Sequence, residues 1–174
     1  MWITERLLLR KWEETDAEQL FLYAKDPEIG RNAGFLPPTT WEDSLNIIRN
    51  VWNRPEYYAI CERMTGKLIG SIALRYHAER EREMGFWIGR PYWGNGYMTE
   101  AVIEMLRHGF EDLHCVCIWC AYYGGNERSK HVQEKVGFVP YAVYENIPVP
   151  FWNEVRSRYI NRMAYIQWQQ IYRP

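Results

Sequence analysis

A glycine-containing loop between a predicted strand and a predicted helix is the segment of this sequence best suited to chemistry. The strand ends near Gly89, the loop holds Gly94 and Gly96, and the helix begins near Met98. The first amides of a helix have no partner within it, and the helix dipole adds partial positive charge there. The segment can therefore bind a phosphate group without a basic side chain, or it can be an ordinary loop that needs glycine for positive φ.

Two common phosphate-binding motifs do not fit this chain. Thr99 stands where a dinucleotide-binding fingerprint has its third glycine, and the preceding strand belongs to a predicted antiparallel meander. At Gly66 and Lys67, Cys61 occupies the position of the first glycine of a P-loop, and Leu68 follows the lysine. The sequence therefore supports neither a dinucleotide site nor a nucleoside triphosphate site.

Three closely spaced cysteines, Cys115, Cys117 and Cys120, resemble a metal site, and His114 precedes them. The surrounding residues are strand formers, and successive side chains of a strand point to opposite faces. Cys115 and Cys117 would then share one face and Cys120 the other, so the three thiols could not meet on one ion. We expect no metal, and we expect reduced thiols in the core, as is usual in the cytosol.

Hydrophobic periodicity and turn signals predict the strands and helices that position these residues. The predicted order is β-α-α-β-β-β-α-β-α-β-β, in which an antiparallel meander leads into a crossover helix. This order predicts the α+β class: one domain over residues 1–174, with a mixed, mostly antiparallel, twisted sheet and helices on both faces. The alternative is a ferredoxin-like sandwich. The expected strands cover 3–10, 57–62, 68–75, 83–89, 114–123, 138–145 and 159–168, and the expected helices begin near 14, 39, 98 and 126.

Several features of the chain predict structural roles rather than chemistry. The four histidines have no neighbours at metal-ligand or triad spacing, so we expect exposed or structural roles, with His108 on the polar face of its helix. A proline after Asp26 is expected to end the first helix, and a loop is expected over 30–38. Residues 146–158 match no recognisable pattern.

Composition excludes several classes of partner. The 174 residues include 21 Lys and Arg against 22 Asp and Glu, so a broad contact with nucleic acid or an anionic membrane is not expected. The sequence has no apolar run long enough to span a bilayer and no signal-peptide core at its amino terminus, which favours a cytoplasmic protein. Aromatic residues make up 16% of the chain, which suits a dense core or a deep cleft.

Three blocks, in the same order along the chain, resemble GNAT-superfamily N-acetyltransferases, in particular the branch that acetylates the amino termini of ribosomal proteins. They are residues 4–10 with 16 and 26–27, residues 83–101, and residues 126–129 with 134–138. The resemblance implies a GNAT-like fold, acetyl-CoA as co-substrate, and direct acetyl transfer to the amine of a peptide, a protein or a small molecule. The rival interpretation is a non-catalytic module that binds acyl-CoA on the same fold. A monomer or a homodimer is expected.

The resemblance also implies residues that hold acetyl-CoA. The end of the strand would pair with the pantetheine arm, the loop amides would bind the pyrophosphate, and the last helix would reach the pantetheine and the sulfur. These residues are Trp87, Ile88 and Gly89; Gly94, Asn95, Gly96, Tyr97, Met98 and Thr99; and Asn126 and Ser129. Trp93 and Met98 depart from the residues usual at their positions in the family, so contacts with the cofactor could differ.

Two residues are implied for catalysis. Glu83 matches the family position of a carboxylate that accepts the proton of the amine, directly or through water, unless it is a surface residue in a charged run. Many members of the superfamily have a tyrosine four residues after the position of Ser129, where this chain has Gln133, which cannot donate a proton as an acid. Ser129 is therefore our candidate for stabilising the departing thiolate, unless it only binds the cofactor or packs its helix.

The acceptor is predicted from aromatic residues at loop positions, where binding residues concentrate. Phe35, Trp93, Phe151 and Trp152 could line a groove for an extended peptide or an apolar amine. No acidic cluster beyond Glu83 stands out, which argues against a polycationic acceptor. A peptide α-amine, with a pKa of about 8, also loses its proton more easily than lysine at about 10.4. We therefore expect a peptide amino terminus to be preferred.

Overall fold

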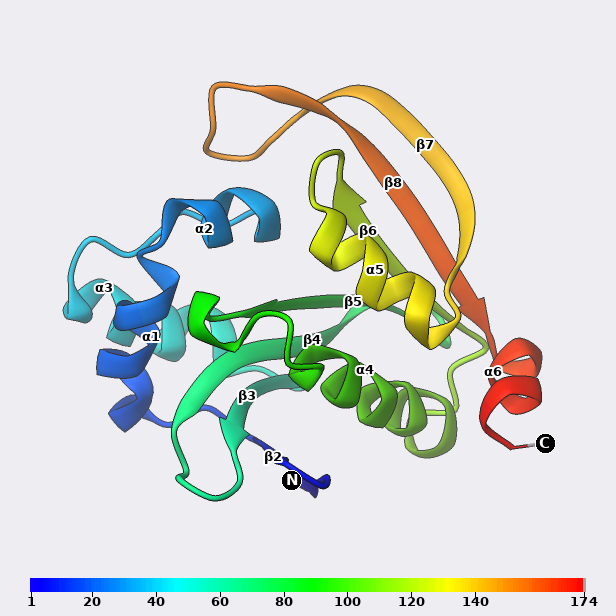
Figure 1. Ribbon diagram of the computed structural model, residues 1–174, viewed down its shortest axis with the longest axis horizontal. Coiled ribbons are helices and arrows are strands. Elements are labelled where there is room, and N and C mark those ends of the chain that lie inside the picture. The colour runs from blue at the N-terminus through cyan, green and yellow to red at the C-terminus, as the bar shows by residue number, and fades with distance from the viewer. Residues whose placement is uncertain (174) are drawn as a thin grey trace.

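A computed structural model describes residues 1–173 and contains one eight-stranded sheet (Figure 1). Its strand order is β1-β2-β3-β4-β5-β6-β8-β7, and every neighbouring pair is antiparallel except β5 and β6. The strands are β1 Trp2–Ile3, β2 Leu7–Arg10, β3 Tyr57–Glu62, β4 Leu68–Ala78, β5 Glu81–Ile88, β6 Cys117–Tyr123, β7 Val139–Pro148 and β8 Val155–Ala164. The mixed, mostly antiparallel sheet confirms the predicted class and excludes the ferredoxin-like alternative.

Helices cover both faces of the sheet and bury two apolar cores. They are α1 Ala17–Ala24, α2 Pro27–Ala33, α3 Trp41–Ile47, α4 Tyr97–Arg107, α5 Glu127–Val136 and α6 Tyr165–Tyr172. Side chains of α4, α5 and α6 form one core with β2 to β6, and those of α1 and α2 form the other with β3 and β4. β5 serves both cores by alternation, since Met84 lies in the first and Trp87 in the second. Among the residues described, no helix combines the length and the apolarity needed to cross a membrane.

The end of the last predicted strand and the start of the predicted loop over 30–38 are wrong. The strand expected over 159–168 ends at Ala164, and the next residues form α6, whose Trp168 packs against Phe110 at 5.5 Å between ring centroids. The first helix, α1, ends at Ala24, before Asp26 and Pro27, as predicted. Pro27 then begins α2, with the Asp26 carboxylate accepting from the Glu28 amide at 3.0 Å. Residues 30–33 of the loop expected over 30–38 are therefore helical.

Of the exposed and structural roles expected for the histidines, His108 has the structural one. His108 is buried, with Nε2 2.7 Å from Glu56 Oε2 and Nδ1 2.8 Å from Asp112 Oδ2. Its ring rests against Trp2 of β1, 4.2 Å between centroids. The chain that covers this helix face comes from the amino terminus and the start of β3, which helical spacing alone does not reveal.

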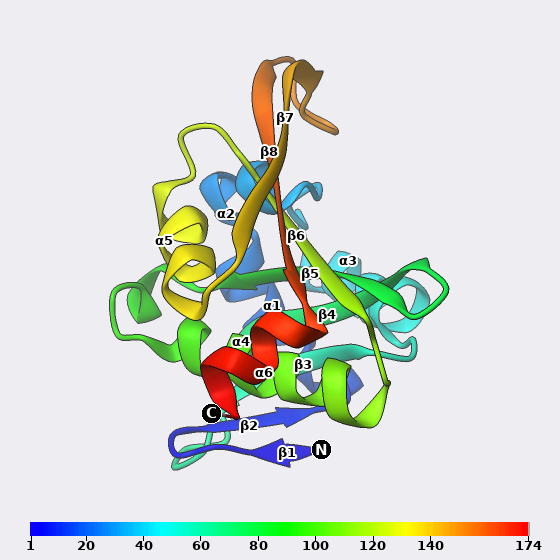
Figure 2. The ribbon, with the colours of Figure 1, turned by 90° about the vertical axis from the view of Figure 1, so that its right-hand side faces the viewer.

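The β7–β8 hairpin extends beyond the rest of the molecule (Figure 2). Its tip approaches α2 through an ion pair between Arg31 and Glu154 and a 2.9 Å hydrogen bond from Arg156 to Asn32. Residues 146–158, which matched no pattern, are therefore the end of β7, the turn and the start of β8. This hairpin brings part of β8 to the edge of the cavity described next.

Candidate active site

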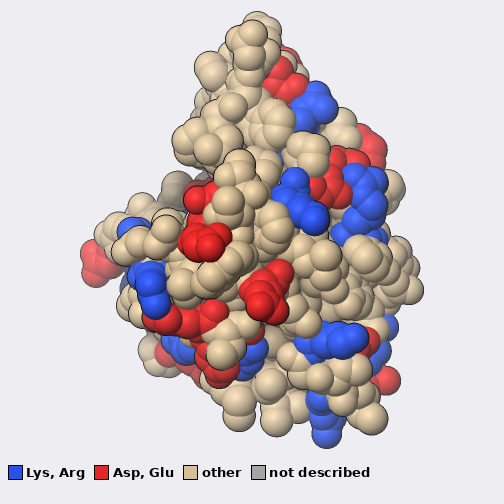
Figure 3. All heavy atoms as spheres, turned by 90° about the vertical axis from the view of Figure 1, so that its left-hand side faces the viewer, with Lys and Arg blue, Asp and Glu red and all other residues tan. Residues whose placement is uncertain are grey.

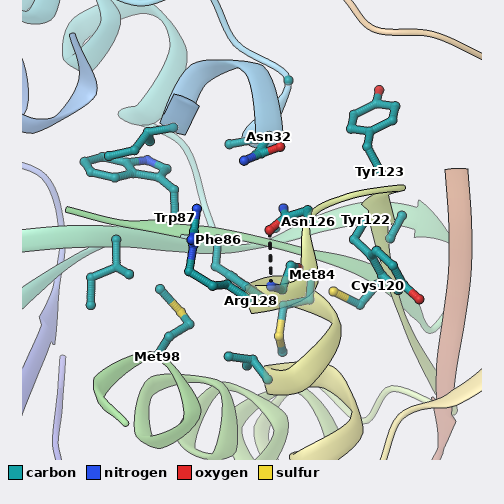
Figure 4. Close-up of a pocket in the computed structure, with 18 of the residues that line it drawn as sticks. Asn32, Met84, Phe86, Trp87, Met98, Cys120, Tyr122, Tyr123, Asn126 and Arg128 are labelled. Atoms are coloured by element: carbon teal, nitrogen blue, oxygen red, sulfur yellow. Dashed lines mark hydrogen bonds between the residues drawn. The ribbon is translucent and has the colours of Figure 1, made fainter. Parts of the chain in front are cut away.

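A cavity forms because β5 and β6 pair over only part of their length. The parallel pairing runs from Glu81 with Cys117 to Met84 with Cys120 and then stops. β5 continues to Ile88 along its other neighbour, β4, while β6 rises away from it (Figure 1). Between the diverging strands lies a cavity of about 320 Å³ (Figure 4). The sheet therefore presents one edge of β5 to this space.

Seven residues singled out from the sequence line this cavity. They come from β5, from the loop after it and from the first turns of α4 and α5, and are Glu83, Trp87, Ile88, Trp93, Met98, Asn126 and Ser129. Gly89, Gly94, Asn95, Gly96, Tyr97 and Thr99 are not part of its wall. The structure thus joins the expected catalytic pair with part of the expected cofactor site.

The loop before α4 has the geometry expected of an anion site. Gly94 and Gly96 have φ values of 77° and 78°. A Cβ on Gly94 would meet no atom within 4 Å, and one on Gly96 would meet only the Arg6 guanidinium at 3.5 Å. Gly96 is the N-cap of α4 and offers no side chain to the first helical amides. Open space above unpaired amides fits the pyrophosphate of acetyl-CoA.

Trp93 lies against the edge of β5 rather than in a wall of aromatic residues. Its Nε1–H donates to the Ile88 carbonyl at 2.8 Å. The Arg128 guanidinium lies 3.7 Å from its ring and that of Arg90 4.7 Å. Two stacked cations hold this indole next to the first turn of α5.

The other predicted acceptor aromatics do not line the cavity. Phe35 packs against Trp52 and Trp87, with ring centroids 6.2 and 6.1 Å apart. Phe151 lies at the β7–β8 turn and is 70% exposed. Trp152 lines a second hollow, between α2 and the hairpin tip.

Asn126 and Ser129 are placed by the start of α5. The Asn126 side chain caps the helix by accepting from the Ser129 amide at 3.3 Å (Figure 4). The Ser129 Oγ accepts from Gln133 Nε2 at 3.1 Å, and Gln133 Oε1 accepts from Asn161 Nδ2 at 2.9 Å. The Ser129 hydroxyl hydrogen is not used in that chain and is free to point into the cavity.

Glu83 lies where the pairing of β5 with β6 is about to end, and two arginines hold it. Its Oε1 accepts from Arg75 Nη2 of β4 at 3.1 Å and from Arg158 Nη2 of β8 at 3.2 Å. Its Oε2 receives no hydrogen bond from any residue between 1 and 173, and the side chain is 25% exposed. A carboxylate oxygen therefore remains for an amine or a water molecule.

Neither arginine was predicted from the sequence. Arg75 could have been found, because a β4–β5 hairpin register places it opposite Glu83. No local signal identified Arg158, since it lies in the segment that matched no pattern and reaches Glu83 from beyond β6.

Cys120 also lines the cavity but is not suited to nucleophilic chemistry. Burial raises the pKa of its thiol far above the ordinary value, so the thiol stays protonated at neutral pH. Within residues 1–173, no group of three His, Cys, Asp or Glu side chains could hold a metal ion.

Comparisons with known proteins agree with this geometry. The family model described as an acetyltransferase (GNAT) domain matches residues 6–139. The uncharacterized N-acetyltransferase YoaA of Bacillus subtilis is 29% identical over 142 residues, which are 78% of this chain and 80% of YoaA. The putative ribosomal N-acetyltransferase YdaF of the same organism is 27% identical over 148 residues, 79% of this chain and 80% of YdaF.

A solved structure shows the same architecture. The GNAT-family acetyltransferase of Bacillus anthracis superposes with a TM-score of 0.85 at 26% identity, over 95% of this chain and 99% of that one. The family model spans most of the sheet, both glycines of the anion loop and the two residues expected to act on the substrates. The chain therefore belongs to the GNAT family and is an N-acetyltransferase, of a family whose acetyl donor is acetyl-CoA.

Proposed function

We propose that this enzyme transfers the acetyl group of acetyl-CoA to the α-amine of a peptide or protein amino terminus. The observation that carries the proposal is the presence of Glu83 and Ser129 on two walls of one cavity, beside a free edge of β5. Glu83 faces the acceptor and Ser129 the leaving group.

Several residues would hold the donor, which supplies an acetyl group as a thioester. The amides at the start of α4 would bind the pyrophosphate next to Gly94 and Gly96. The edge of β5 that β6 leaves unpaired would take the amide groups of the pantetheine arm, between Met98 and Val132 of the cavity wall.

The reaction divides between two side chains of this protein. The amine nitrogen attacks the thioester carbonyl carbon, a C–N bond forms and the C–S bond breaks. The proton of the amine passes to Glu83, directly or through a water molecule at Oε2. The hydroxyl of Ser129 donates a hydrogen bond to the departing sulfur, which stabilises its negative charge.

The surroundings of Glu83 favour an α-amine over lysine. A cationic amine that approaches Glu83 also approaches Arg75 and Arg158, and like charges disfavour the protonated form. An α-amine has a pKa of about 8, against about 10.4 for lysine, so its neutral form is more accessible. The name of YdaF, a putative ribosomal N-acetyltransferase, supports the same class of acceptor.

Competition between two peptides tests this proposal. One peptide has a blocked amino terminus and an internal lysine, and the other has a free amino terminus and no lysine. We expect mass spectrometry to find faster acetylation of the free terminus. Faster acetylation of the blocked peptide would overturn the choice of acceptor, and CoA binding without turnover on any amine would favour the non-catalytic module.

We also infer that the enzyme works in the cytoplasm. Its four cysteines, Cys61, Cys115, Cys117 and Cys120, are all buried and free. Unpaired thiols are usual in a reducing compartment.

A further inference from the structure

The charged side chains that line the cavity are mostly cations. The cations are Arg75, Arg128 and Arg158, and the only carboxylate among the described residues of the wall is that of Glu83. The whole chain has a net charge of −1, and acidic and basic groups are interspersed on the face that carries α1 and α3 (Figure 3). The excess of positive charge is therefore local to the cavity.

Arg128 already has partners at the end of the cavity where we expect the cofactor. It is ion-paired with Glu28 and stacked on Trp93. The cations that remain beside Glu83 are Arg75 and Arg158, whose side chains are 45% and 38% exposed.

These two arginines keep most of their donors free. Each gives one Nη2–H to Glu83 Oε1, and their Nε and Nη1 groups make no hydrogen bond to residues 1–173. Gly85 leaves room for the Arg75 guanidinium, because a Cβ at position 85 would lie 3.1 Å from Arg75 Nη2. The pair thus offers planar, unused donors next to the expected base.

We propose that the acceptor carries a carboxylate close to its reacting amine, as in a peptide with Asp or Glu at its first or second position, and that Arg75 and Arg158 bind this carboxylate. The proposal rests on the proposed function. Guanidinium groups match carboxylates in geometry and charge. An acidic side chain would also offset the repulsion that two cations exert on an approaching ammonium group. A polyamine would meet that repulsion in full.

Three peptides that differ only at the second residue test the proposal. Each has a free alanine at its amino terminus, and the second residue is Asp, Asn or Lys. None has a lysine at any other position. We expect kcat/KM to fall in the order Asp, Asn, Lys, with Asp over Asn by about tenfold, which is typical of hydrogen bonds to a charged group.

Matched variants separate binding from folding. Arg158→Gln and Arg75→Gln should bring the Asp-to-Asn ratio close to one, with a smaller effect on the Asn peptide. The control is Arg162→Gln, since Arg162 also lies on β8 but stacks on Tyr141, 4.9 Å from its ring, and does not line the cavity. Its ratio should match that of the wild type.

The outcomes distinguish the carboxylate site from the proposed function. Equal rates for all three peptides, or an Asp preference that survives both arginine variants, would overturn the carboxylate site and leave the proposed function standing. No acetylation of any free terminus would overturn both.

A second inference comes from the buried chain Asn161–Gln133–Ser129. Gln133 is fully buried and Asn161 is 6% exposed, so two amides lie between α5 and β8 where apolar side chains would pack without a desolvation cost. We infer that Gln133 positions Ser129: because it donates to Oγ, it directs the hydroxyl hydrogen away from itself and towards the departing sulfur.

Two substitutions of Gln133 test this role. Gln133→Glu keeps the shape but accepts the Ser129 hydroxyl, and should lower kcat about 100-fold with little change in the KM for acetyl-CoA. Gln133→Met keeps the volume without a hydrogen bond and should lower kcat less.

Binding of CoA gives a readout independent of turnover. Wild-type affinity for CoA should rise relative to S-methyl-CoA as the pH passes about 8.5, the ordinary pKa of a thiol. Gln133→Glu should remove that rise, and Gln133→Met should reduce it. If both variants fold and keep the wild-type kcat and pH dependence, Gln133 is only a packing residue.

Discussion

Replacing Gly96 by Val should abolish the response of the protein to CoA while leaving it folded. Gly96 has a φ of 78°, and a Cβ there would meet only Arg6 at 3.5 Å, so the substitution creates strain but no clash within the protein. Gly66, in the β3–β4 turn, provides a matched control, because its φ is 69° and a Cβ there meets nothing within 4 Å.

The two variants should lose similar stability. A side chain in the left-handed region costs about 1–2 kcal/mol. For a domain of this size each 1 kcal/mol lowers Tm by about 2–4 °C, so both variants should melt about 2–8 °C below the wild type. CoA at about 100 times its Kd should stabilise the wild type by about 2.7 kcal/mol.

Thermal melts with and without CoA separate strain from binding. The CoA-dependent rise in Tm should persist in Gly66→Val and vanish in Gly96→Val, because the new side chain occupies the space in which a phosphate would approach the first amides of α4. A Gly96→Val protein that melts lower but keeps the full response to CoA would refute the assignment of the anion loop.

Three further predictions follow from the same structure. Glu83→Gln should lower turnover by about 10²–10⁴-fold with little effect on CoA affinity and should remove the acidic limb of the pH–rate profile, whereas a loss below about threefold would make Glu83 a surface residue. Gly70→Ala should destabilise the protein by about 1–3 kcal/mol or more in urea unfolding, since its Cβ would lie 2.4 Å from the Trp87 carbonyl oxygen, and a neutral effect would contradict the tight β4–β5 contact. Burial lowers the pKa of His108, but its two carboxylate partners outweigh this and raise it above 6.5. The stabilisation is complete below that value and is lost as the pH rises through the raised pKa, so His108→Gln should cost more at about pH 6 than at about pH 9; an equal cost at both would contradict the raised pKa.

Local chemistry explains which parts of the fold could be predicted from the sequence. The positive φ of Gly94 and Gly96, the Asn126 cap and the left-handed Gly137 that ends α5 each depend on a few adjacent residues. The alternation of β5 between the two cores also depends only on its own side chains. The helix α6 could not be separated from β8 because its apolar residues fit both periods.

Part of the charge of the site depends on pairing between strands far apart in the sequence, and that part could not be predicted in the same way. Glu83 was found from its motif, but its environment comes from residues 8 and 75 positions away in the sequence. Arg158 reaches Glu83 only because β8 pairs with β6 and β6 pairs with β5.

The cavity is a consequence of register rather than of any single motif. β4 pairs with β5 as far as Ile88, whereas β6 pairs with it only to Met84. Because β4 holds the strand extended after β6 has left it, the free edge keeps a geometry that can pair with an amide chain without first being ordered. Gly70 permits this arrangement by letting the backbone of β4 lie close to Trp87 and Ile88. A residue on β4, outside the cavity wall, therefore helps to shape the edge that we expect to bind the donor, and Glu83 lies next to the point where that edge begins.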